Sequence, residues 1–106
     1  MVIIPLSPIP NQRLAIPLEG ALFGLHLKAA GNTMTITINK GGETVVSGMR
    51  CVPNVPLIPY RYLEGTTGNF YFTTAGGEYP HYSRFGGADE LVYATAAELK
   101  ELRHGK

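Results

Sequence analysis

The feature that most constrains the fold is a strand-like alternation, interrupted by turn residues, between residues 12 and 40. Apolar side chains occupy every second position in three consecutive segments: Leu14, Ile16 and Leu18, then Phe23, Leu25 and Leu27, then Met34, Ile36 and Ile38. Period-two alternation places such side chains on one face of a β-strand. Glu19-Gly20, Gly31-Asn32 and Lys40-Gly41-Gly42 separate the segments and predict turns. The sequence therefore predicts strands joined by hairpins, with a fourth strand over 43–52.

Two shorter segments farther along the chain also predict strands. Residues 69–74 are rich in aromatic and β-branched side chains, and residues 90–94 restore an apolar strand pattern. Alternation puts Phe70 and Phe72 on one face, so we expect both rings in the core. Between these strands, residues 79–87 are rich in tyrosine but have no usable period, which predicts a loop.

The two ends of the chain carry clear local signals of their own. Three prolines within the first ten residues remove amide donors and disfavour a helix. We therefore expect residues 1–11 to form an extended N-terminal arm or edge strand. Near the other end, Thr95-Ala96-Ala97-Glu98 fits a capping box, in which the Thr95 and Glu98 side chains satisfy each other's backbone amides. It predicts a C-terminal helix over 95–104.

Length and turn spacing together define the expected fold class. A chain of 106 residues has the usual size of one domain. Turn signals recur roughly every eight to twelve residues without alternating helices, which is typical of antiparallel sandwiches and small barrels. We therefore expect one all-β domain over residues 1–106, an antiparallel sandwich or small barrel with a short C-terminal helix.

Charge and cysteine content argue against several classes of function. The net charge is +1, and no window gathers lysine and arginine into a patch that can neutralise several phosphates. Specific nucleic-acid binding is therefore not expected. The early prolines interrupt any apolar run of membrane or signal-peptide length, so we expect no membrane insertion. A single cysteine gives no disulfide framework and favours synthesis in a reducing cytoplasm.

No compact catalytic or metal-binding motif stands out in the sequence. The histidines His26, His81 and His104 lie far apart, and Cys51 has no activating neighbour except Arg50, so we expect Cys51 to be a small buried side chain. The acidic residues fall at predicted turns, strand starts or the helix, where carboxylates are usually solvated. We expect no metal, no cofactor and no enzyme activity. An enzyme survives as an option only if folding gathers His81, Cys51 and an acid in one pocket.

Aromatic residues in irregular segments are the strongest candidates for a functional surface. Only 16% of the residues are charged, against about 25% in typical proteins, so the surface is expected to be either polar but uncharged or partly covered by partners. Aromatic rings and arginine suit protein contacts. Residues 53–59 are interpreted as a stiff connector that presents Tyr60-Arg61-Tyr62 to a neighbour, with Cys51 anchored in the core behind it. The predicted partner interface comprises Pro53, Pro56, Pro59, Tyr60, Arg61, Tyr62, Tyr79, His81, Tyr82 and Phe85.

Sequence motifs along nearly the whole chain point to a known family. They are Ile-Ile-Pro-Leu-Ser-Pro-Ile-Pro-Asn-Gln, Val-Val-Ser-Gly-Met-Arg-Cys, Tyr-Leu-Glu-Gly, Gly-Asn-Phe-Tyr-Phe and Glu-Leu-Val-Tyr-Ala-Thr-Ala-Ala-Glu-Leu. From Ile3 to about Leu102, the chain resembles the small baseplate plug proteins of contractile-tailed bacteriophages, the cyanophage-type plug. The chain departs from the family in its richness in proline between Pro53 and Pro59.

The resemblance implies a non-enzymatic all-β subunit at the centre of the phage tail tip. Such a subunit contacts hub, spike, tube or wedge proteins and closes the channel until ejection. Its implied location is the virion tail baseplate, after synthesis in the host bacterial cytoplasm, and self-association within the assembly stays open. Residues 2–10 match the family's N-terminal segment and residues 51–65 its central segment, and neither is a reactive site in that family.

A second class of function fits some of the same residues. In a small ligand-binding β module, tyrosines stack on a sugar or a nucleobase. The tyrosines in question are Tyr60, Tyr62, Tyr79 and Tyr82. A gene position among tube, hub and wedge genes favours the plug, whereas micromolar ligand binding that is lost in Tyr79→Ala favours the module.

Overall fold

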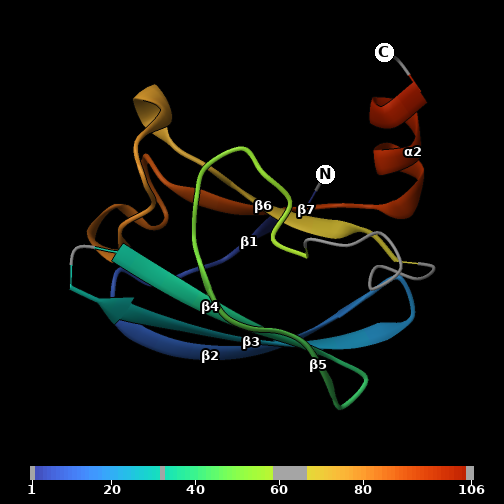
Figure 1. The fold of residues 1–106 in the computed structure, drawn as a ribbon, viewed down its shortest axis with the longest axis horizontal. Helices are drawn as coiled ribbons and strands as arrows, with labels where there is room; N and C mark the ends of the chain where they lie inside the picture. The colour runs from blue at the N-terminus through green and yellow to red at the C-terminus, as the bar shows by residue number, and fades with distance from the viewer. Residues whose placement is uncertain (1, 32, 59–66, 105–106) are drawn as a thin grey trace.

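The computed structural model describes residues 2–31, 33–58 and 67–104, whose strands form two antiparallel sheets stacked as an open sandwich (Figure 1). The four-stranded sheet has the order β2-β3-β4-β5, and the three-stranded sheet has the order β1-β7-β6. The elements are β1 (Val2–Ile4), β2 (Asn11–Leu18), β3 (Ala21–Ala30), β4 (Thr33–Lys40), β5 (Glu43–Arg50), β6 (Asn69–Thr73), η1 (Ala75–Gly77), η2 (Tyr82–Arg84), β7 (Glu90–Ala94) and α2 (Ala96–His104). The predicted fold class is confirmed as a sandwich, and the described strands do not close into a barrel.

The four-stranded sheet follows the alternation of the sequence closely. The β2–β3 hairpin closes with Leu18 opposite Ala21. Both turn residues, Glu19 (φ 50°) and Gly20 (φ 78°), have a positive φ, as a two-residue turn that matches the right-handed twist of the strands requires. Along β3 and β4, every second side chain is buried, as the sequence predicted. Hairpins join all four strands in chain order.

The strand β5 is less regular than the sequence predicted. The pairing with β4 shifts register between Ile36 and Ile38, and again between Ile38 and Asn39. At the first shift Gly48 has a φ of 59°, and its amide donates to the Thr37 hydroxyl at 3.0 Å instead of to the ladder. The strand predicted over 43–52 therefore ends at Arg50.

The three-stranded sheet is assembled from distant parts of the chain. Its central strand β7 pairs with β6 on one side and with β1 on the other, where Ile4 lies opposite Leu91. The segment after β1 returns the chain to β2, and the Gln12 side chain bonds the amide and the carbonyl of Ser7 at 3.1 and 2.7 Å. The N-terminal residues are thus tied to the body of the protein.

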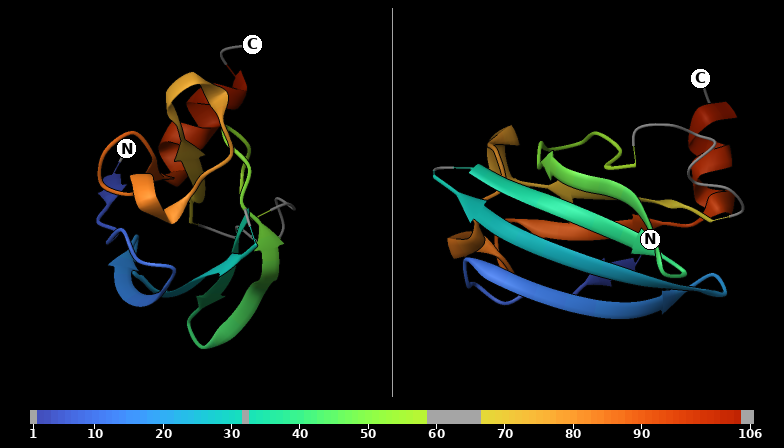
Figure 2. Two further views of the ribbon diagram at one scale, coloured as in Figure 1. Left: turned by 90° about the vertical axis from the view of Figure 1, so that its left-hand side faces the viewer. Right: turned by 60° about the horizontal axis from the view of Figure 1, so that its bottom comes forward.

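An aromatic cluster joins the two sheets in the middle of the core. The ring of Phe23 in β3 packs edge to face on the ring of Phe70 in β6, with 5.2 Å between ring centres. The Tyr93 ring of β7 has its centre 5.8 Å from that of Phe23 and 5.0 Å from that of Phe70. All three side chains are fully buried. Figure 2 shows the four-stranded sheet on one side of this core and β6 and β7 on the other. The prediction that Phe70 and Phe72 are core residues is confirmed.

A hydrogen-bond node at Glu19 ties the β2–β3 turn to the far sheet and to α2. The Tyr93 hydroxyl donates to Glu19 Oε1 at 2.5 Å and accepts from the Gly68 amide at 2.7 Å. The Ala96 amide also donates to Glu19 Oε1, at 3.0 Å. Burial and the hydrogen bond to Glu19 raise the pKa of Tyr93, so the phenol stays protonated at neutral pH.

The C-terminal helix α2 begins with the predicted capping box. The Thr95 amide donates to Glu98 Oε1 at 2.9 Å, and the Glu98 amide donates to the Thr95 hydroxyl at 3.2 Å. Leu99 of this helix is buried. Among the described residues, no helix has the length and apolar character needed to cross a membrane.

Candidate functional site

The proline segment, residues 53–58, runs alongside β6 and is not a free connector. Pro53 forms a parallel bridge with Phe72, the Asn54 amide donates to the Phe72 carbonyl at 2.8 Å, and the Leu57 amide donates to the Phe70 carbonyl at 2.9 Å. Leu57 and its neighbour Ile58 are buried in the core. The segment therefore covers the outer edge of β6. The sequence missed this because two aliphatic residues between prolines have no period to mark them as core.

Asn69 fastens the end of this segment. Its side-chain oxygen accepts from the Ile58 amide at 2.9 Å, and its side-chain nitrogen donates to the Ile58 carbonyl at 2.8 Å. Asn69 is fully buried, so both bonds are shielded from water. Of the predicted interface, Pro53 and Pro56 are half-buried here. Pro59, Tyr60, Arg61 and Tyr62 lie outside the described residues.

Among the described residues of the predicted interface, the most exposed aromatic residue lies in the tyrosine-rich loop. Tyr79 is 47% exposed, and the Arg50 guanidinium lies 4.5 Å from the centre of its ring. This cation–π contact connects the loop to the end of β5. Arg50 was not among the predicted interface residues, because only the tertiary structure brings β5 next to residue 79.

A buried aspartate shapes the rest of the loop. Asp89 Oδ2 accepts from the His81 amide at 2.9 Å and from Arg84 Nε at 3.0 Å, and Arg84 Nη2 donates to the Tyr79 carbonyl at 2.7 Å. Asp89 is fully buried. The expectation that it is a solvated acid is therefore wrong, because the arginine and a backbone amide replace the water around one of its oxygens.

His81, Tyr82 and Phe85 occupy different depths in this loop. The His81 and Tyr82 rings stack with 4.4 Å between their centres, and His81 Nδ1 lies 2.8 Å from the Ser83 hydroxyl. Tyr82 is half-buried and packs against the core. Phe85 is only 4% exposed, and its ring stacks on that of Phe72 with 5.9 Å between ring centres. Phe85 is thus a core residue, which corrects its assignment to the exposed interface, because the loop folds back over β6.

The structure gives Cys51 and His81, the two side chains with reactive potential, defined surroundings. Cys51 is buried, as predicted, and burial raises the pKa of its thiol to about 12, so it is protonated at neutral pH. His81 Nδ1 lies 2.8 Å from the Ser83 hydroxyl, and it is the backbone amide of His81 that donates to Asp89. No group of three or more histidine, cysteine, aspartate or glutamate side chains among the described residues is placed to hold a metal ion.

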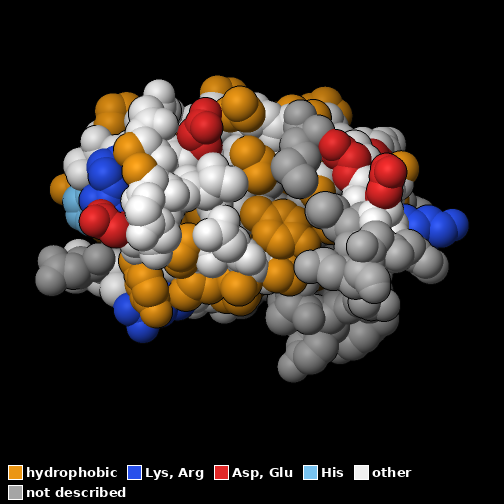
Figure 3. All heavy atoms as spheres, turned by 90° about the horizontal axis from the view of Figure 1, so that it is seen from above, with side chains coloured by type: hydrophobic (Ala, Val, Ile, Leu, Met, Phe, Trp, Pro, Cys, Tyr) orange, Lys and Arg blue, Asp and Glu red, His pale blue; other side chains and the backbone are white. Residues whose placement is uncertain are grey.

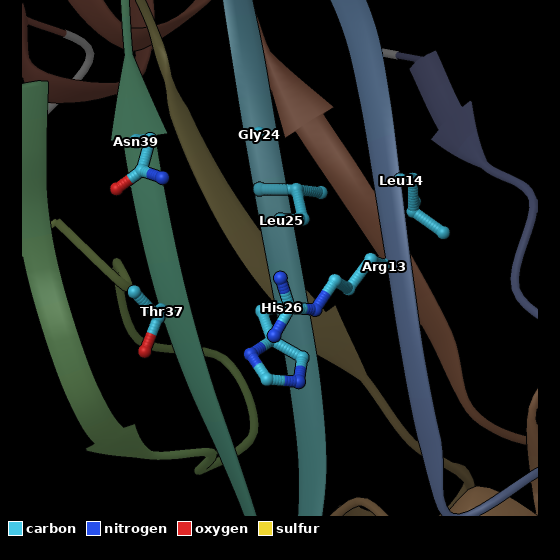
Figure 4. Close-up of a pocket in the computed structure, with 7 residues that line it drawn as sticks. All are labelled: Arg13, Leu14, Gly24, Leu25, His26, Thr37 and Asn39. Carbon is cyan, nitrogen blue, oxygen red and sulfur yellow. The ribbon is translucent and has the colours of Figure 1, made fainter. Parts of the chain in front are cut away.

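The outer face of the four-stranded sheet has a shallow groove of about 140 Å³ (Figure 4). Arg13 of β2 lies opposite His26 of β3, and His26 lies opposite Thr37 of β4. Figure 4 shows the Arg13 side chain reaching toward the His26 ring. Partial burial and the charges of Arg13 and Lys28 lower the pKa of His26, so the ring is neutral at neutral pH. Only the strand register brings these basic residues together.

The match with a known family covers most of the chain. The family described as cyanophage baseplate Pam3 plug gp18 matches residues 1–96. The matched range contains all strands of both sheets and reaches Ala96, the first residue of α2. No curated protein matches the chain. The resemblance found in the sequence motifs is thereby confirmed, and the chain belongs to the cyanophage baseplate plug family.

Proposed function

We propose that this protein plugs or bridges the central channel of a phage tail baseplate through contacts with hub, spike, tube or wedge proteins. The observation that carries this proposal is the family match over residues 1–96, which makes the protein a structural component of a phage tail. The protein acts without catalysis and without a cofactor. It is made in the cytoplasm of the host bacterium and is then built into the virion.

The surface of the loop over residues 79–82, together with Arg50, is suited to a protein contact. An exposed tyrosine under a guanidinium offers a large apolar area and several hydrogen-bond donors, the combination enriched at binding hot spots. Asp89 and Arg84 hold the backbone behind this surface, so little conformational entropy is lost on binding. Pro53, Pro56 and the segment Pro59 to Tyr62 belong to the same proposed interface.

The distribution of side chains on this side of the molecule also supports a partner. Figure 3, which views the molecule from above relative to Figure 1, shows hydrophobic side chains among backbone and other uncharged groups over much of the middle of this face, with charged side chains mainly toward its rim. Interfaces are depleted of charged residues at their centre and polar at their rim. The mechanism that follows is steric: the rigid sandwich fills the passage, and loss of these contacts opens it. Contacts between two copies of the protein within the assembly use the same kind of surface.

Complementation of a phage that lacks this gene tests the proposal. Purified tails are expected to contain the wild-type protein at the tip, and tails without it are expected to release their contents before host contact. Tyr79→Ala is expected to lower incorporation several-fold. Leu22→Ala is the matched control, because Leu22 is 57% exposed on the opposite sheet. Tails that close normally without the protein, or tails that never contain it, would falsify the proposal.

A further inference from the structure

The outer face of the four-stranded sheet carries positive charge that no acid of the same sheet balances. Within β2 to β5 the only acidic residue is Glu43, which lies opposite Lys40 at the end of the β4–β5 hairpin. On the outer face, Arg13 lies opposite His26, and Lys28 follows two positions farther along β3. Arg13 and Lys28 are exposed, and neither forms an ion pair with a carboxylate of the described residues. This part of the face is therefore uncompensated.

A glycine opens the groove in this face. Gly24 of β3 lies between Ala15 of β2 and Asn39 of β4, and a Cβ atom on it would lie 3.8 Å from Asn39 Nδ2. Without that side chain, a groove of about 140 Å³ stays open between Arg13 and Asn39. The volume is below the range of about 300–1,000 Å³ for small-molecule pockets. The groove therefore suits the end of one side chain better than a larger free ligand.

The groove offers hydrogen-bond donors whose acceptor atoms are already engaged inside the sheet. Asn39 Oδ1 accepts from the Thr44 hydroxyl at 2.8 Å, and Figure 4 shows the Asn39 nitrogen turned toward β3. The Thr37 hydroxyl accepts from the Gly48 amide at 3.0 Å, and it donates its own proton to no described residue. The Arg13 guanidinium carries donors only. The chemical group that complements this set is an anionic acceptor.

We propose that this groove receives an aspartate or glutamate side chain of a different tail protein, whose carboxylate accepts hydrogen bonds from Arg13, Thr37 and Asn39. The inference rests on the proposed function, because it requires a partner in the tail. The bond from the guanidinium is charge-assisted and is the strongest of the three. Leu14 and Leu25 also line the groove, and the methylene carbons of the guest side chain lie against them.

Charge favours an acidic protein side chain over a nucleic acid. Nucleic-acid binding depends on neutralising several phosphates at once, whereas Arg13 and Lys28 give this part of the face only two permanent charges. Charge complementarity of that size sets the choice and register of a protein partner. The paired residues Lys28, Thr35 and Arg50 form a row across the sheet, and Arg50 lies over the Tyr79 ring. A partner on the proposed interface can therefore extend along this row to the groove.

Carbodiimide coupling in assembled tails tests the contact directly. Arg13→Lys keeps the positive charge and places a primary amine at the groove. Carbodiimide joins an amine to a carboxylate that touches it, so we expect an amide link between position 13 and an aspartate or glutamate of a different tail protein. Lys100, exposed on α2, is the control amine in the same sample and is expected to give at least fivefold less of such a link. Mass spectrometry of purified tails identifies the links and reports whether the protein is present.

The outcomes separate this inference from the proposed function. If the protein is present in tails but position 13 links to no other tail protein, the groove is not a docking site and the inference is wrong, while the baseplate role stands. If the protein is absent from tails, the proposed function itself fails. A link from position 13 to a second copy of this chain alone, or equal links from positions 13 and 100, also contradicts the inference.

A small probe tests the groove in the isolated protein. Propionate mimics the end of a glutamate side chain, and tens of millimolar are expected to shift the amide NMR signals of Gly24, His26 and Thr37. Propionamide, the neutral control, is expected to shift them at least threefold less. Arg13→Gln is expected to weaken propionate binding at least threefold, whereas Lys100→Gln removes a charge elsewhere and is expected to leave it unchanged. Equal shifts with both probes, or no shift with either, overturn the assignment to a carboxylate.

The pH dependence of propionate binding gives a second readout. Arg13 faces His26 from β2, Lys28 lies beside it on β3, and the uncharged Thr37 lies opposite on β4. Partial burial and these two cations lower the pKa of His26. A bound carboxylate favours the protonated ring, so propionate is expected to raise the pKa of His26 and to bind at least twofold more tightly at pH 6 than at pH 8. An unchanged His26 pKa, or weaker binding at pH 6, would contradict the proposed placement of the carboxylate.

Discussion

The four-stranded and three-stranded sheets face the same core, but the chain builds them differently. The strands of the first sheet follow one another through short hairpin turns, and each pairs with its neighbour in sequence. In the second sheet, Val2 lies opposite Tyr93, and β6 is separated from the preceding strand by the long segment that contains the prolines. Local pairing assembles the first sheet, whereas closing long loops is required for the second.

The second sheet is held by specific contacts that the first sheet does not need. Asn69 fixes the proline segment to β6, and the Tyr93 hydroxyl links Gly68 to Glu19. Gly68 packs so closely on β7 that a Cβ atom there would lie 1.7 Å from the Ala94 carbonyl oxygen. The difference teaches that the three-stranded sheet depends on a few individual residues, while the four-stranded sheet depends on a repeated pattern.

Gly68→Ala is expected to have the largest effect on this comparison. The added methyl group clashes with the backbone of β7, so we expect the free energy of unfolding to fall by about 4 kcal/mol or more. Gly20→Ala, in the β2–β3 turn, is the control: its Cβ meets nothing within 4 Å, and it is expected to lose only about 1–2 kcal/mol through its positive φ. Urea unfolding measures both, and equal losses would contradict the contrast.

Asn69→Ala is expected to loosen the proline segment from β6. It removes two buried hydrogen bonds to Ile58, for an expected loss of about 3 kcal/mol. Amide exchange at Leu57 and Ile58 should speed up more than at Ile36 in β4. Gln12→Ala is the control, because Gln12 bonds both backbone groups of Ser7 in an exposed place, and about 0.5 kcal/mol is expected. Unchanged exchange at Leu57 in Asn69→Ala would show that packing and the backbone bonds to Phe70 and Phe72 hold the segment without Asn69.

Alkaline pH is expected to weaken the core where β5 meets the proline segment. The Cys51 thiol has a pKa of about 12 in the folded protein, above its unfolded value of about 8.5. The stabilisation is fully present below pH 8.5 and is lost as pH rises toward 12, at about 1.4 kcal/mol per pH unit. Denaturant unfolding from pH 8 to 11 should show this slope in the wild type and a smaller one in Cys51→Ala. Identical slopes would mean that the thiol is not buried.

A more modest effect is expected from Thr95→Ala, which removes the cap of α2. The Glu98 amide loses its bond to the Thr95 hydroxyl, and about 1 kcal/mol is expected to be lost. Faster exchange of the Leu99 amide should accompany the loss, because that amide donates to the Thr95 carbonyl. Thr33→Ala, which removes a hydroxyl bond to Ala30 in a hairpin turn, is expected to cost about 0.5 kcal/mol. A larger effect at Thr33 than at Thr95 would reverse the ranking.

Much of the fold could be predicted because its signals are local. Apolar side chains at every second position placed Leu25 and Ile38 in the core, Glu19 and Gly20 marked a turn, and Thr95 and Glu98 marked a helix start. Each of these signals lies within a few residues of the structure it specifies. The family was also predictable, since its motifs are contiguous in the chain.

The candidate surface was predicted less well because burial in loops is a tertiary property. Tyr79 is exposed, but Phe85 in the same loop is a core residue stacked on Phe72. Asp89, expected in solvent, is buried because Arg84 and the His81 amide replace water around one oxygen. Nothing in a window of a few residues distinguishes these cases, since the partner groups lie on other segments.

The sequence by itself determined the four-stranded sheet, its turns and the family, because alternation, turn residues and motifs act over short distances. Only the tertiary structure decided that residues 53–58 cover one edge of the second sheet, while β1 is the last strand on the other edge among the described residues. It alone also decided that Asp89 is buried, with an Oδ1 atom that bonds to none of the described residues. The physical reason is that edges, cavities and unpaired atoms exist only once distant segments have packed together.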